Sequence, residues 1–589
     1  MPYSHSHAYS RHIYGKCALT EPQLQAVNAI LRPQCQGLML VHTMGTGKTL
    51  TTIAMIDHLI NNGDTTRDVV AYIVTRPKLC EAFERQIQDA GVDETKYLVL
   101  PYSNFVRLYK RLDPSVYVID STNSENVCRD ETYAEDLLKD VYLVIDEAHN
   151  ARTPGTDLAR ALQWMAPFCN KVILLTGTPI VNSPGDISIL LNALQTRVSF
   201  PQSPKDFNAK YISDMGHGNI TLQNQDILED AIGGLISYYC PNPGRVVADG
   251  LFPVVVHHYE DVPMSELQTR IYNDLEQEYL TPESRILLDR VPSLSSSDEL
   301  FECAATTSSP SPLSTEGGAA DESDDVTGTR KPNAKLNLPQ QRRGRPRLNT
   351  STRHLANAAT FALNCFLNKT RQISNSAHQW TSLEPVSEKH RAIVREIVQG
   401  AKPAVVFSSF VKSGLDPLIA YMQTLDPPLR LATIKGSSTT RDVANTVARF
   451  NNRLVDVLFL SAAAGEGIDL KNTRQIHVME PHWNNARIEQ AIGRAVRYRS
   501  HIELPLDEQR VDVWHWISVR PQEDVVMDGS MANLLLANQQ IPTADQYLAK
   551  VARYKQQITE MFMAFLADNS IQKTYSISLD IGAQTELVR

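Results

Sequence analysis

A glycine-rich run near the start of the chain constrains its fold more than any other feature. Residues 42–49 read His-Thr-Met-Gly-Thr-Gly-Lys-Thr, and an apolar helical pattern follows them. Such a turn between a strand and a helix offers backbone N–H groups and a lysine ammonium, which together bind phosphates. His42 stands where the full pattern has its first glycine. The run predicts a nucleotide-binding turn in an α/β domain.

A second run, far downstream, can supply arginines to that nucleotide. Residues 490–497 read Gln-Ala-Ile-Gly-Arg-Ala-Val-Arg, so Arg494 and Arg497 are three positions apart and share one helix face. An isolated pair of this kind is usually a surface salt-bridge partner. Because Gln490 and Gly493 precede the pair, we interpret it as an arginine finger that reaches the γ-phosphate when two lobes meet.

Length and composition allow several structural units. The chain has 589 residues, of which 42% are apolar and 21% charged, as in ordinary globular proteins. A net charge of -9 excludes a uniformly basic surface but allows a local basic channel for nucleic acid. The eight cysteines form no metal-binding spacing, which favours free thiols in a reducing compartment. No apolar run has the roughly 18 residues of a membrane span, so we expect an intracellular protein or one packaged in a particle.

Short apolar runs alternate with helical patterns in both halves of the chain. In the first half they cover 69–74, 141–145 and 171–175, and in the second half 404–407, 454–460, 475–479 and 513–517. Each of the first three ends at a polar motif. Open α/β sheets bind ligands at the carboxyl ends of their strands. The pattern predicts two α/β lobes whose polar motifs line one edge of each sheet.

The order of these patterns gives expected domain boundaries. A Ser/Thr/Pro-rich tract, acidic and then basic, cannot bury enough apolar area to fold, and we expect it to be a disordered linker. Apolar residues at helical spacing between Tyr547 and Phe565 predict a closing helix on the second lobe. The expected units are a first lobe (1–195), a mainly helical insertion (196–290), the linker (291–350), a helical connection (351–385), a second lobe (386–520) and a C-terminal helical extension (521–589).

Two polar motifs of the first lobe suit ATP hydrolysis. Lys48 is expected at the β/γ-phosphates and Thr49 at Mg²⁺, with the amides of the preceding turn around the phosphate oxygens. Asp146 and Glu147 follow an apolar strand; alone, such a pair would be a solvated strand end. Beside a phosphate-binding turn, we assign Asp146 to Mg²⁺ and Glu147 to the attacking water. The turn residues are Gly45, Thr46 and Gly47.

Together these motifs resemble the superfamily 2 helicases, and within them the Snf2-like group. Gln23 looks like that family's adenine-reading glutamine, and 146–149 is its DEAH box. Residues 176–182 resemble the motif that couples hydrolysis to nucleic acid, and 465–470 resemble motif V, which brings Gly467 and Asp469 to the nucleotide. The resemblance implies two RecA-like P-loop lobes. Ala464 and Glu466 depart from the family pattern of motif V, which leaves its grip on nucleic acid open.

Two further segments are similar to the viral branch of this group. Residues 371–375 and 405–415 look like parts of the poxvirus nucleoside triphosphate phosphohydrolase I and early transcription factor type. The resemblance implies a nucleic-acid-dependent ATPase that translocates on DNA, in viral transcription or DNA remodelling, with ATP and Mg²⁺ as cofactors. An RNA polymerase or transcription complex is an expected partner, and the virion or the host cytoplasm or nucleus the expected place.

Other roles stay open at this stage. One alternative is a transcription initiation or termination subunit that uses ATP to switch partner binding without translocating. Another is a DNA anchor with a vestigial motor, against which the complete set of ATP-site residues argues. The anchor would be Arg343 and Arg345, in an Arg-Gly-Arg-Pro sequence that suits either an A·T minor groove or a basic linker or nuclear-localisation patch.

In the resembled family, nucleic acid crosses the tops of both lobes and contacts them mainly through its phosphates. Hydroxyl and cationic side chains at the ends of strands could make such contacts. Each of them could equally be a solvated loop residue. The candidates are Thr75, Arg76, Lys78, Thr178, Ser408 and Lys435.

Overall fold

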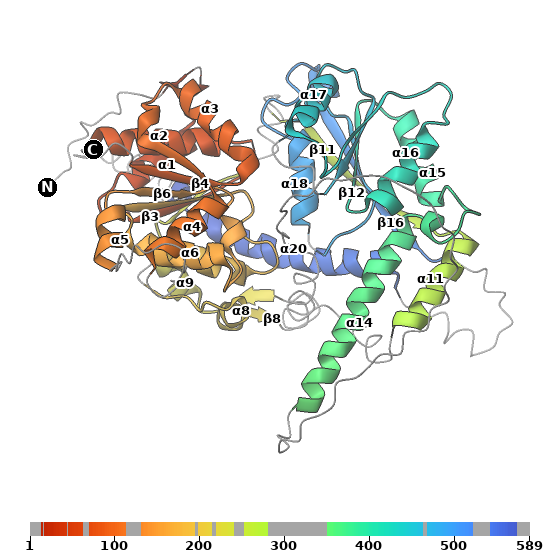
Figure 1. Ribbon diagram of the computed structural model, residues 1–589, viewed down its shortest axis with the longest axis horizontal. Helices are drawn as coiled ribbons and strands as arrows, with labels where there is room; N and C mark the ends of the chain where they lie inside the picture. Colours follow the sequence, from red (N-terminus) through yellow and green to blue (C-terminus); the bar gives the residue numbers. More distant parts are fainter. Residues whose placement is uncertain are drawn as a thin grey trace, which may run out of the picture.

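The computed structural model contains two α/β lobes that lie side by side above one long helix (Figure 1). It describes residues 13–15, 17–43, 45–62, 70–113, 131–194, 198–214, 220–240, 252–280, 350–462, 468–483, 485–521 and 542–573. The expected linker, Gly467, Arg343 and Arg345 lie outside these residues. Among the helices described, none combines the length and the apolar composition needed to cross a membrane.

The first lobe is built on a six-stranded sheet in the order β10-β3-β7-β6-β4-β5. All neighbouring strands are parallel, and the residues of the four inner strands are almost all buried, as expected for a sheet covered on both faces. The strands are β3 (Gly37–His42), β4 (Ala71–Thr75), β5 (Tyr97–Pro101), β6 (Tyr142–Ile145), β7 (Lys171–Thr176) and β10 (Ile236–Tyr239).

Helices cover both faces of this sheet. One apolar core joins the sheet to α1 (Glu21–Ile30), α2 (Lys48–Asn62) and α3 (Cys80–Ala90). A second core lies on the opposite face and joins a larger set of helices: α4 (Tyr102–Leu112), α5 (Glu131–Leu138), α6 (Asp157–Met165), α7 (Ser188–Ala193), α8 (Pro204–Tyr211) and α9 (Gln225–Ile232). Two small hairpins complete the lobe: β1 (Ile13–Tyr14) with β2 (Cys17–Ala18), and β8 (Ile212–Asp214) with β9 (Ile220–Leu222).

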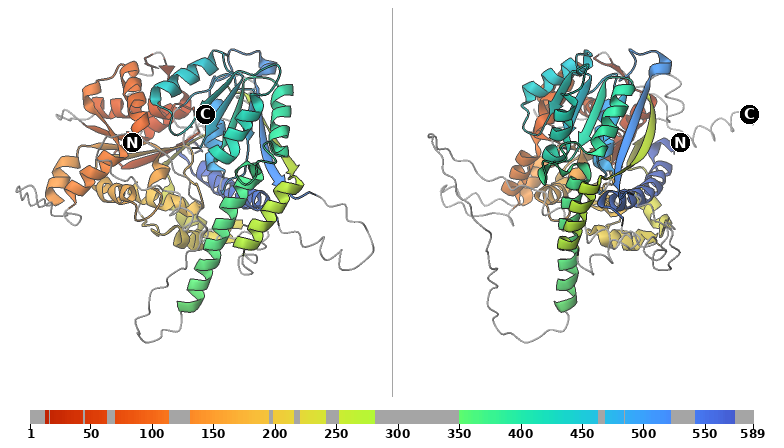
Figure 2. Two further views of the ribbon diagram at one scale, coloured as in Figure 1. Left: turned by 45° about the vertical axis from the view of Figure 1, so that its right-hand side comes forward. Right: turned by 90° about the vertical axis from the view of Figure 1, so that its right-hand side faces the viewer.

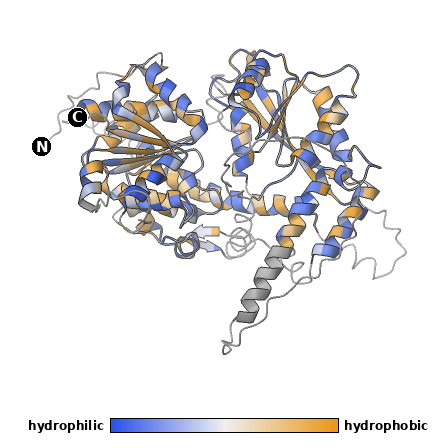
Figure 3. Ribbon diagram, in the orientation of Figure 1, coloured by the Kyte–Doolittle hydropathy of each residue, from blue (hydrophilic) through white to orange (hydrophobic). Residues whose placement is uncertain are grey.

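The second lobe repeats this plan with a parallel sheet in the order β11-β16-β15-β12-β14-β13. Strands in the middle of both sheets are coloured mainly as hydrophobic in Figure 3. The strands are β11 (Val254–Pro263), β12 (Ala404–Ser408), β13 (Leu431–Ile434), β14 (Val457–Ser461), β15 (Gln475–Val478) and β16 (Arg510–Val519). The helices are α15 (Glu388–Gln399), α16 (Asp416–Met422), α17 (Thr440–Asn451) and α18 (Ala486–Ala495). The prediction of two parallel α/β lobes is confirmed.

The range expected as a mainly helical insertion also contains an edge strand of each sheet. β10 pairs with β3 in the first lobe, and β11 pairs with β16 in the second. Neither strand has a strong apolar signature, because β10 has only four residues and β11 carries two histidines and two acids on an exposed edge. Both strands are held by pairing with buried neighbours, which the local sequence does not reveal.

Helix α20 (Ala544–Asp568) contacts both lobes, whereas the sequence predicted a helix on the second lobe alone. Its first half packs Tyr547, Leu548 and Val551 against α11 (Glu266–Tyr279) and α14 (Thr350–Asn375), which lie side by side on the second lobe (Figure 2). Its second half inserts Phe562 and Phe565 into the core of the first lobe. One apolar stripe therefore serves two cores, and α20 connects them.

Candidate functional site

A cleft of about 380 Å³ lies where the two lobes face each other. Its walls come from the glycine-rich turn, the end of β6, helix α3 and helix α18. The two sequence runs that prompted the two-lobe prediction therefore meet in one site. The lining residues are Gly45, Gly47, Lys48, Thr49, Arg76, Leu79, Ala82, Phe83, Gln86, Asp146, Glu147, His149, Gln490, Arg494 and Arg497.

The two glycines of the turn are required by its geometry. Both have φ of +80°, a backbone conformation that favours glycine. A Cβ on Gly47 would lie 2.6 Å from Nε2 of Gln23, and one on Gly45 would lie 3.3 Å from Cβ of Arg497. The turn is thus held closely between α1 of its own lobe and the end of α18 from the other lobe.

Gln23 fixes this turn to the start of α1. Its Oε1 accepts from the backbone N–H of Thr20 at 2.7 Å, which caps the helix, and its Nε2 donates to the carbonyl of Thr46 at 3.0 Å. The side chain is buried. In this structure both ends of the amide serve the protein, and its assignment to adenine stays a prediction.

Lys48 lies across the mouth of the turn. Its ammonium donates to the carbonyls of His42 at 2.9 Å and Thr43 at 3.2 Å. Burial lowers the pKa of Lys48, and the nearby carboxylates of Glu147 and Asp146 oppose that shift. A cation held by neutral carbonyls and facing two carboxylates can turn to phosphate oxygens without crossing the cleft.

Asp146 is half-buried and directly follows β6. Its Oδ2 accepts from the hydroxyl of Thr75 at 2.8 Å, and Tyr102 donates to its backbone carbonyl at 2.6 Å. Burial, together with the charge of Glu147, raises the pKa of Asp146 to about 6. Two adjacent acids that repel each other in a buried site fit a divalent cation, and carboxylate and hydroxyl oxygens are the ligands that Mg²⁺ prefers. Asp146 and Thr49 would hold it.

Glu147 adopts a strained conformation that turns its side chain toward the cleft. Its φ is 48°, which is uncommon for a residue other than glycine, and Asn150 donates to its carbonyl at 2.8 Å. Its Oε2 lies 3.4 Å from Nδ1 of His149, which in turn lies 3.2 Å from the hydroxyl of Thr176. Burial lowers the pKa of His149 to about 4, so the ring is neutral. This ring joins the acid to the motif after β7.

His149 and Tyr102 are site residues to which sequence reasoning gave no role. The histidine was visible in the motif at 146–149, and its contact with Thr176 joins two motifs that the sequence analysis treated separately. Tyr102 had no such signal. Tyr102 follows β5, which ends at Pro101, and Asp146 follows β6. Only β4 lies between these two strands in the sheet, so the tyrosine side chain reaches across the end of β4 to Asp146.

Arg494 in α18 and Arg497, which lies two residues beyond the end of this helix, both face the first lobe. The prediction that the two arginines share one helix face is wrong, because α18 ends at Ala495 and the next residue has a non-helical backbone. Nε of Arg497 donates to the carbonyl of Gly493 at 2.8 Å, and its guanidinium lies 3.7 Å from Asp469. Burial lowers the pKa of Arg497, while Asp469 and Glu147 raise it; arginine remains charged in such surroundings. Arg494 is buried and lines the same cleft. Both cations therefore stand across from Lys48 and Glu147, as the finger interpretation requires.

Three of the expected nucleic-acid contacts lie elsewhere than predicted. Thr75 is fully buried, and its hydroxyl is used by Asp146. Ser408 is fully buried as well, and its hydroxyl donates to Glu480 at 2.9 Å. Neither hydroxyl reaches the surface that nucleic acid would touch, because each satisfies a buried carboxylate. Arg76 lines the ATP cleft and donates to Asn150 at 2.9 Å.

The other described candidates lie at the surface or close to it. Lys78 is exposed, and Thr178 is half-buried with its N–H bonded to the hydroxyl of Thr176. Lys435 pairs with Asp416 at 2.8 Å. For these residues, contact with nucleic acid stays a prediction. Arg343, Arg345 and Gly467 lie outside the described residues.

Comparison with protein families finds two domains in the chain. Residues 22–306 match the SNF2-related domain, and residues 388–499 match the helicase conserved C-terminal domain. The first match holds the glycine-rich turn and the Asp146-Glu147 pair, and the second holds Arg494 and Arg497.

Two of the curated relatives are viral proteins. The chain is 26% identical over 543 residues to a protein of Acanthamoeba polyphaga mimivirus named as an ATP-dependent RNA helicase, covering 92% of this chain and 95% of the relative. It is 22% identical to a termination factor NPH-I homolog of African swine fever virus, covering 83% of this chain and 70% of the relative.

Solved structures with some likeness include the SWI2/SNF2 ATPase core of Sulfolobus solfataricus in complex with double-stranded DNA. It is 17% identical with a TM-score of 0.32, over 94% of this chain and 96% of that one. The Hef helicase domain of Pyrococcus furiosus is 14% identical with a TM-score of 0.40, over 88% of this chain and 98% of that one. The fold described above stands independently of these likenesses. With its two matched domains meeting at the cleft, the chain is an ATP-hydrolysing enzyme built from an SNF2-related domain and a helicase C-terminal domain.

Proposed function

We propose that this enzyme is a nucleic-acid-dependent ATPase that translocates on DNA, most naturally on the duplex, in viral transcription or DNA remodelling. One observation carries the proposal: Lys48 and Glu147 of the first lobe share a cleft with Arg494 and Arg497 of the second. Hydrolysis at such a site depends on the distance between the lobes. A polymer bound across both lobes can therefore control it.

The chemistry would be divided between the lobes. Lys48 and the turn amides bind the β- and γ-phosphates, and Glu147 orients and polarises the attacking water. Arg494 and Arg497 stabilise the charge that develops on the γ-phosphate, and Gln490 lines the same cleft. Bound Mg²⁺, held by Asp146 and Thr49, would neutralise phosphate charge. Product release removes the anion that holds the arginines against the first lobe, and the cleft can then open.

A chain of contacts leads from Glu147 to the loop after β7, and it supports the proposal that the enzyme translocates. Nδ1 of His149 lies within reach of both Glu147, at 3.4 Å, and Thr176, at 3.2 Å. The hydroxyl of Thr176 also accepts the N–H of Thr178, in the loop that follows β7. A shift of that loop on polymer binding would change the surroundings of Glu147. If the lobes alternate their grip on backbone phosphates during each cycle, the enzyme steps along the strand.

The viral relatives support a role in infected cells or virions. Their names divide between an RNA helicase and a termination factor, so they do not favour one polymer. We choose DNA as the polymer because the motifs of the chain are Snf2-like. Stimulation of hydrolysis by RNA alone would correct this choice.

A second function has a specific observation in its favour. Because one relative is named as a termination factor homolog, ATP could instead switch binding to an RNA polymerase or transcription complex without translocation. In that case hydrolysis would change affinity for the polymerase and would not require movement along the polymer.

The test is ATP hydrolysis alone and with single-stranded DNA, duplex DNA or single-stranded RNA. The blank is Glu147→Gln, which should lower turnover by about 10²–10⁴-fold because it removes the group that polarises water. Strong stimulation by duplex DNA is the expected result. Stimulation by RNA alone would make RNA, and not DNA, the polymer of this enzyme. If no polymer stimulates hydrolysis although ATP still binds, the second function, a switch of partner binding, would be favoured.

A further inference from the structure

The chain that follows α20 reaches the nucleotide-binding turn. Near the end of α20, Phe562 and Phe565 are buried in the core on one face of the first sheet. A few residues later, Ile571 is buried in the core on the opposite face. Since β10 is the edge strand on this side, the chain passes around that edge between the two cores. The strand next to β10 is β3, which leads directly into the turn.

Gln572 binds three residues of two elements at this edge. Its Oε1 accepts from the backbone N–H of Tyr238 at 2.9 Å. Its Nε2 donates to the hydroxyl of Ser237 at 2.8 Å and to the carbonyl of Pro22 at 3.3 Å. Ser237 and Tyr238 belong to β10, and Pro22 is at the start of α1. The amide of Gln572 therefore uses both its donor and its acceptor to hold β10 against α1.

Ser237 passes this contact on to His42. Its hydroxyl is fully buried and lies 2.9 Å from Nε2 of His42. The hydroxyl accepts from Gln572 and keeps a second lone pair and its own proton, so it can bond either neutral tautomer of the imidazole. Burial lowers the pKa of His42 to about 3, so the ring is neutral. The ring also packs edge-on against Tyr239 at 5.7 Å between centroids.

These contacts approach the turn from its two ends. His42 is the first residue of the turn, and its carbonyl accepts from the ammonium of Lys48 at 2.9 Å. Pro22 adjoins Gln23, whose amide donates to the carbonyl of Thr46 at 3.0 Å. Gln572 thus acts on the beginning of the turn through Ser237 and His42, and on its end through α1.

We propose that Gln572 is a positioning residue for ATP: it holds the nucleotide-binding turn in its binding conformation through Ser237 and His42. The proposal rests on the proposed ATP site at Lys48. It gives His42 a role, since a glycine at this position could not bind Ser237. It also gives the C-terminal segment a role in nucleotide affinity, without contact between Gln572 and ATP.

Gln572→Ala tests this directly. Losing the amide should raise KM for ATP, and Kd for a non-hydrolysable ATP analogue, by about three- to tenfold, the range expected for one or two hydrogen bonds. The value of kcat at saturating ATP should stay within about twofold, because the catalytic groups are intact. Gln572→Glu keeps the acceptor but loses both donors, so it should behave like alanine. Lys573→Ala is the matched control, since Lys573 is exposed and pairs only with Asp568 among the contacts seen.

A double-mutant cycle distinguishes an effect of Gln572 on the nucleotide-binding turn from a role only in attaching the C-terminal segment to the first lobe. Ser237→Ala should give a similar loss of ATP affinity, and the double variant should lose less than the sum of the two single losses, because both residues act through His42 and only the contact with Pro22 is separate. Additive losses would overturn the proposal. So would a fall in Tm for Gln572→Ala with unchanged ATP affinity. Lys48→Ala is measured alongside: if it binds ATP as the wild type does, the ATP site itself is wrong and this inference falls with it.

Discussion

The two lobes share one architecture but use the carboxyl ends of their strands differently. In the first lobe, Lys48, Asp146 and Glu147 line the inter-lobe cleft and carry charge that other side chains only partly balance. In the second lobe, Ser408 and Glu480 lie at the same edge of the sheet but are buried and bound to each other. One edge is left open to a ligand, and the other is closed by its own side chains.

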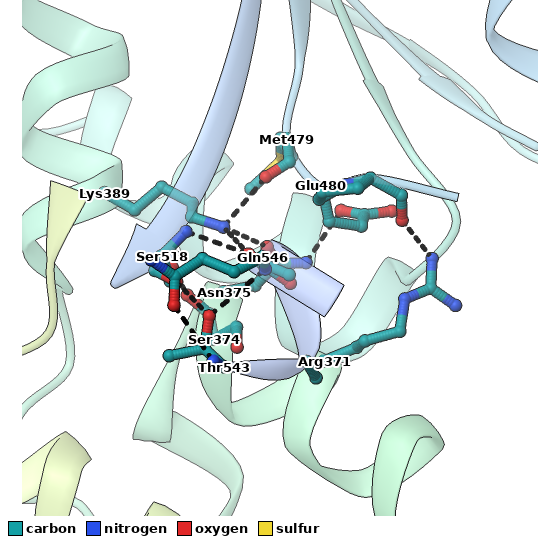
Figure 4. A network of polar contacts seen from close by, with 12 residues as sticks. Arg371, Ser374, Asn375, Lys389, Met479, Glu480, Ser518, Thr543 and Gln546 are labelled. Atoms are coloured by element: carbon teal, nitrogen blue, oxygen red, sulfur yellow. Dashed lines mark hydrogen bonds and ion pairs between the residues drawn. The ribbon is translucent and has the colours of Figure 1, made fainter. Parts of the chain in front are cut away.

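The closed edge of the second lobe is a buried polar network (Figure 4). Glu480 accepts from the N–H of Ser409 at 2.6 Å and from Asn375 at 2.8 Å. Lys389 and Asp545 form an ion pair at 2.9 Å with side chains only 1% and 0% exposed. Asn375 is the last residue of α14 and Asp545 is near the start of α20. The network therefore anchors these two helices to the sheet.

This difference shows what the position of a polar residue does and does not reveal. A polar side chain after a buried strand is placed at the ligand-binding edge by the fold. Whether it meets a ligand depends on the neighbours that other segments bring. Ser408 meets Glu480, whereas Glu147 meets the cleft and a neutral imidazole.

Breaking the ion pair of the second lobe should have a large effect on stability. Lys389→Ala leaves Asp545 buried without its cation, and the free energy of unfolding should fall by about 3–5 kcal/mol. The matched change in the first lobe is Lys110→Ala, which removes an exposed pair with Asp157 and should cost at most about 1 kcal/mol. Urea unfolding measures both. Equal costs would contradict the contrast between a buried network and exposed pairs.

Acid should destabilise the second lobe through His477. Its ring is fully buried between Gln475 and Trp516, and burial lowers its pKa to about 3. Below about pH 6.5 the imidazole binds a proton in the unfolded chain but not in the native protein. The free energy of unfolding therefore falls by roughly 1.4 kcal/mol for each unit by which the pH decreases. His477→Gln should therefore reduce the loss of stability between pH 7 and 5 by about 2 kcal/mol. Above pH 8 the stability curves of the two proteins should run parallel, and a variant that stays parallel down to pH 5 would contradict this assignment.

Ser408→Ala distinguishes a structural hydroxyl from a nucleic-acid contact. The change removes one donor from buried Glu480 and the acceptor for the N–H of Phe410, and should cost about 1–3 kcal/mol of stability. Polymer affinity should be unchanged. Weaker polymer binding at full stability would restore the role that sequence alone assigned to Ser408.

Lys78→Ala should have the smallest effect, and only on polymer binding. Because this lysine is exposed, its loss should leave stability unchanged and lower the slope of log affinity against log salt by about 1. Lys139→Ala is the control, since that exposed lysine pairs with Asp136. Equal salt slopes for the wild type and Lys78→Ala would remove Lys78 from the polymer surface.

Much of the ATP cleft could be predicted from sequence because its signals are local. Each of these signals is contained in fewer than ten residues: a buried strand, a glycine turn with a lysine, and an acidic pair. Even the meeting of Gly45 with Arg497 followed from two such runs, once two lobes were assumed.

The rest depended on contacts between distant segments. Gln572 reaches Ser237 and Pro22 only because α20 crosses from one lobe to the other. Its apolar stripe predicted the helix but could not specify two partners. In the same way, the buried states of Thr75 and Ser408 are set by carboxylates from other strands. Hydroxyl side chains look alike in sequence whether they face water or an acid.

The central claim, that the two lobes form one ATP site, is tested most directly by Arg497→Ala. Binding of a non-hydrolysable ATP analogue and single-turnover hydrolysis are measured on the same protein, with Lys48→Ala beside it. The account predicts that Arg497→Ala lowers hydrolysis by about 10³-fold or more but keeps binding within a few-fold, whereas Lys48→Ala loses both. Hydrolysis at the wild-type rate in Arg497→Ala, or equal loss of binding in both variants, would contradict it.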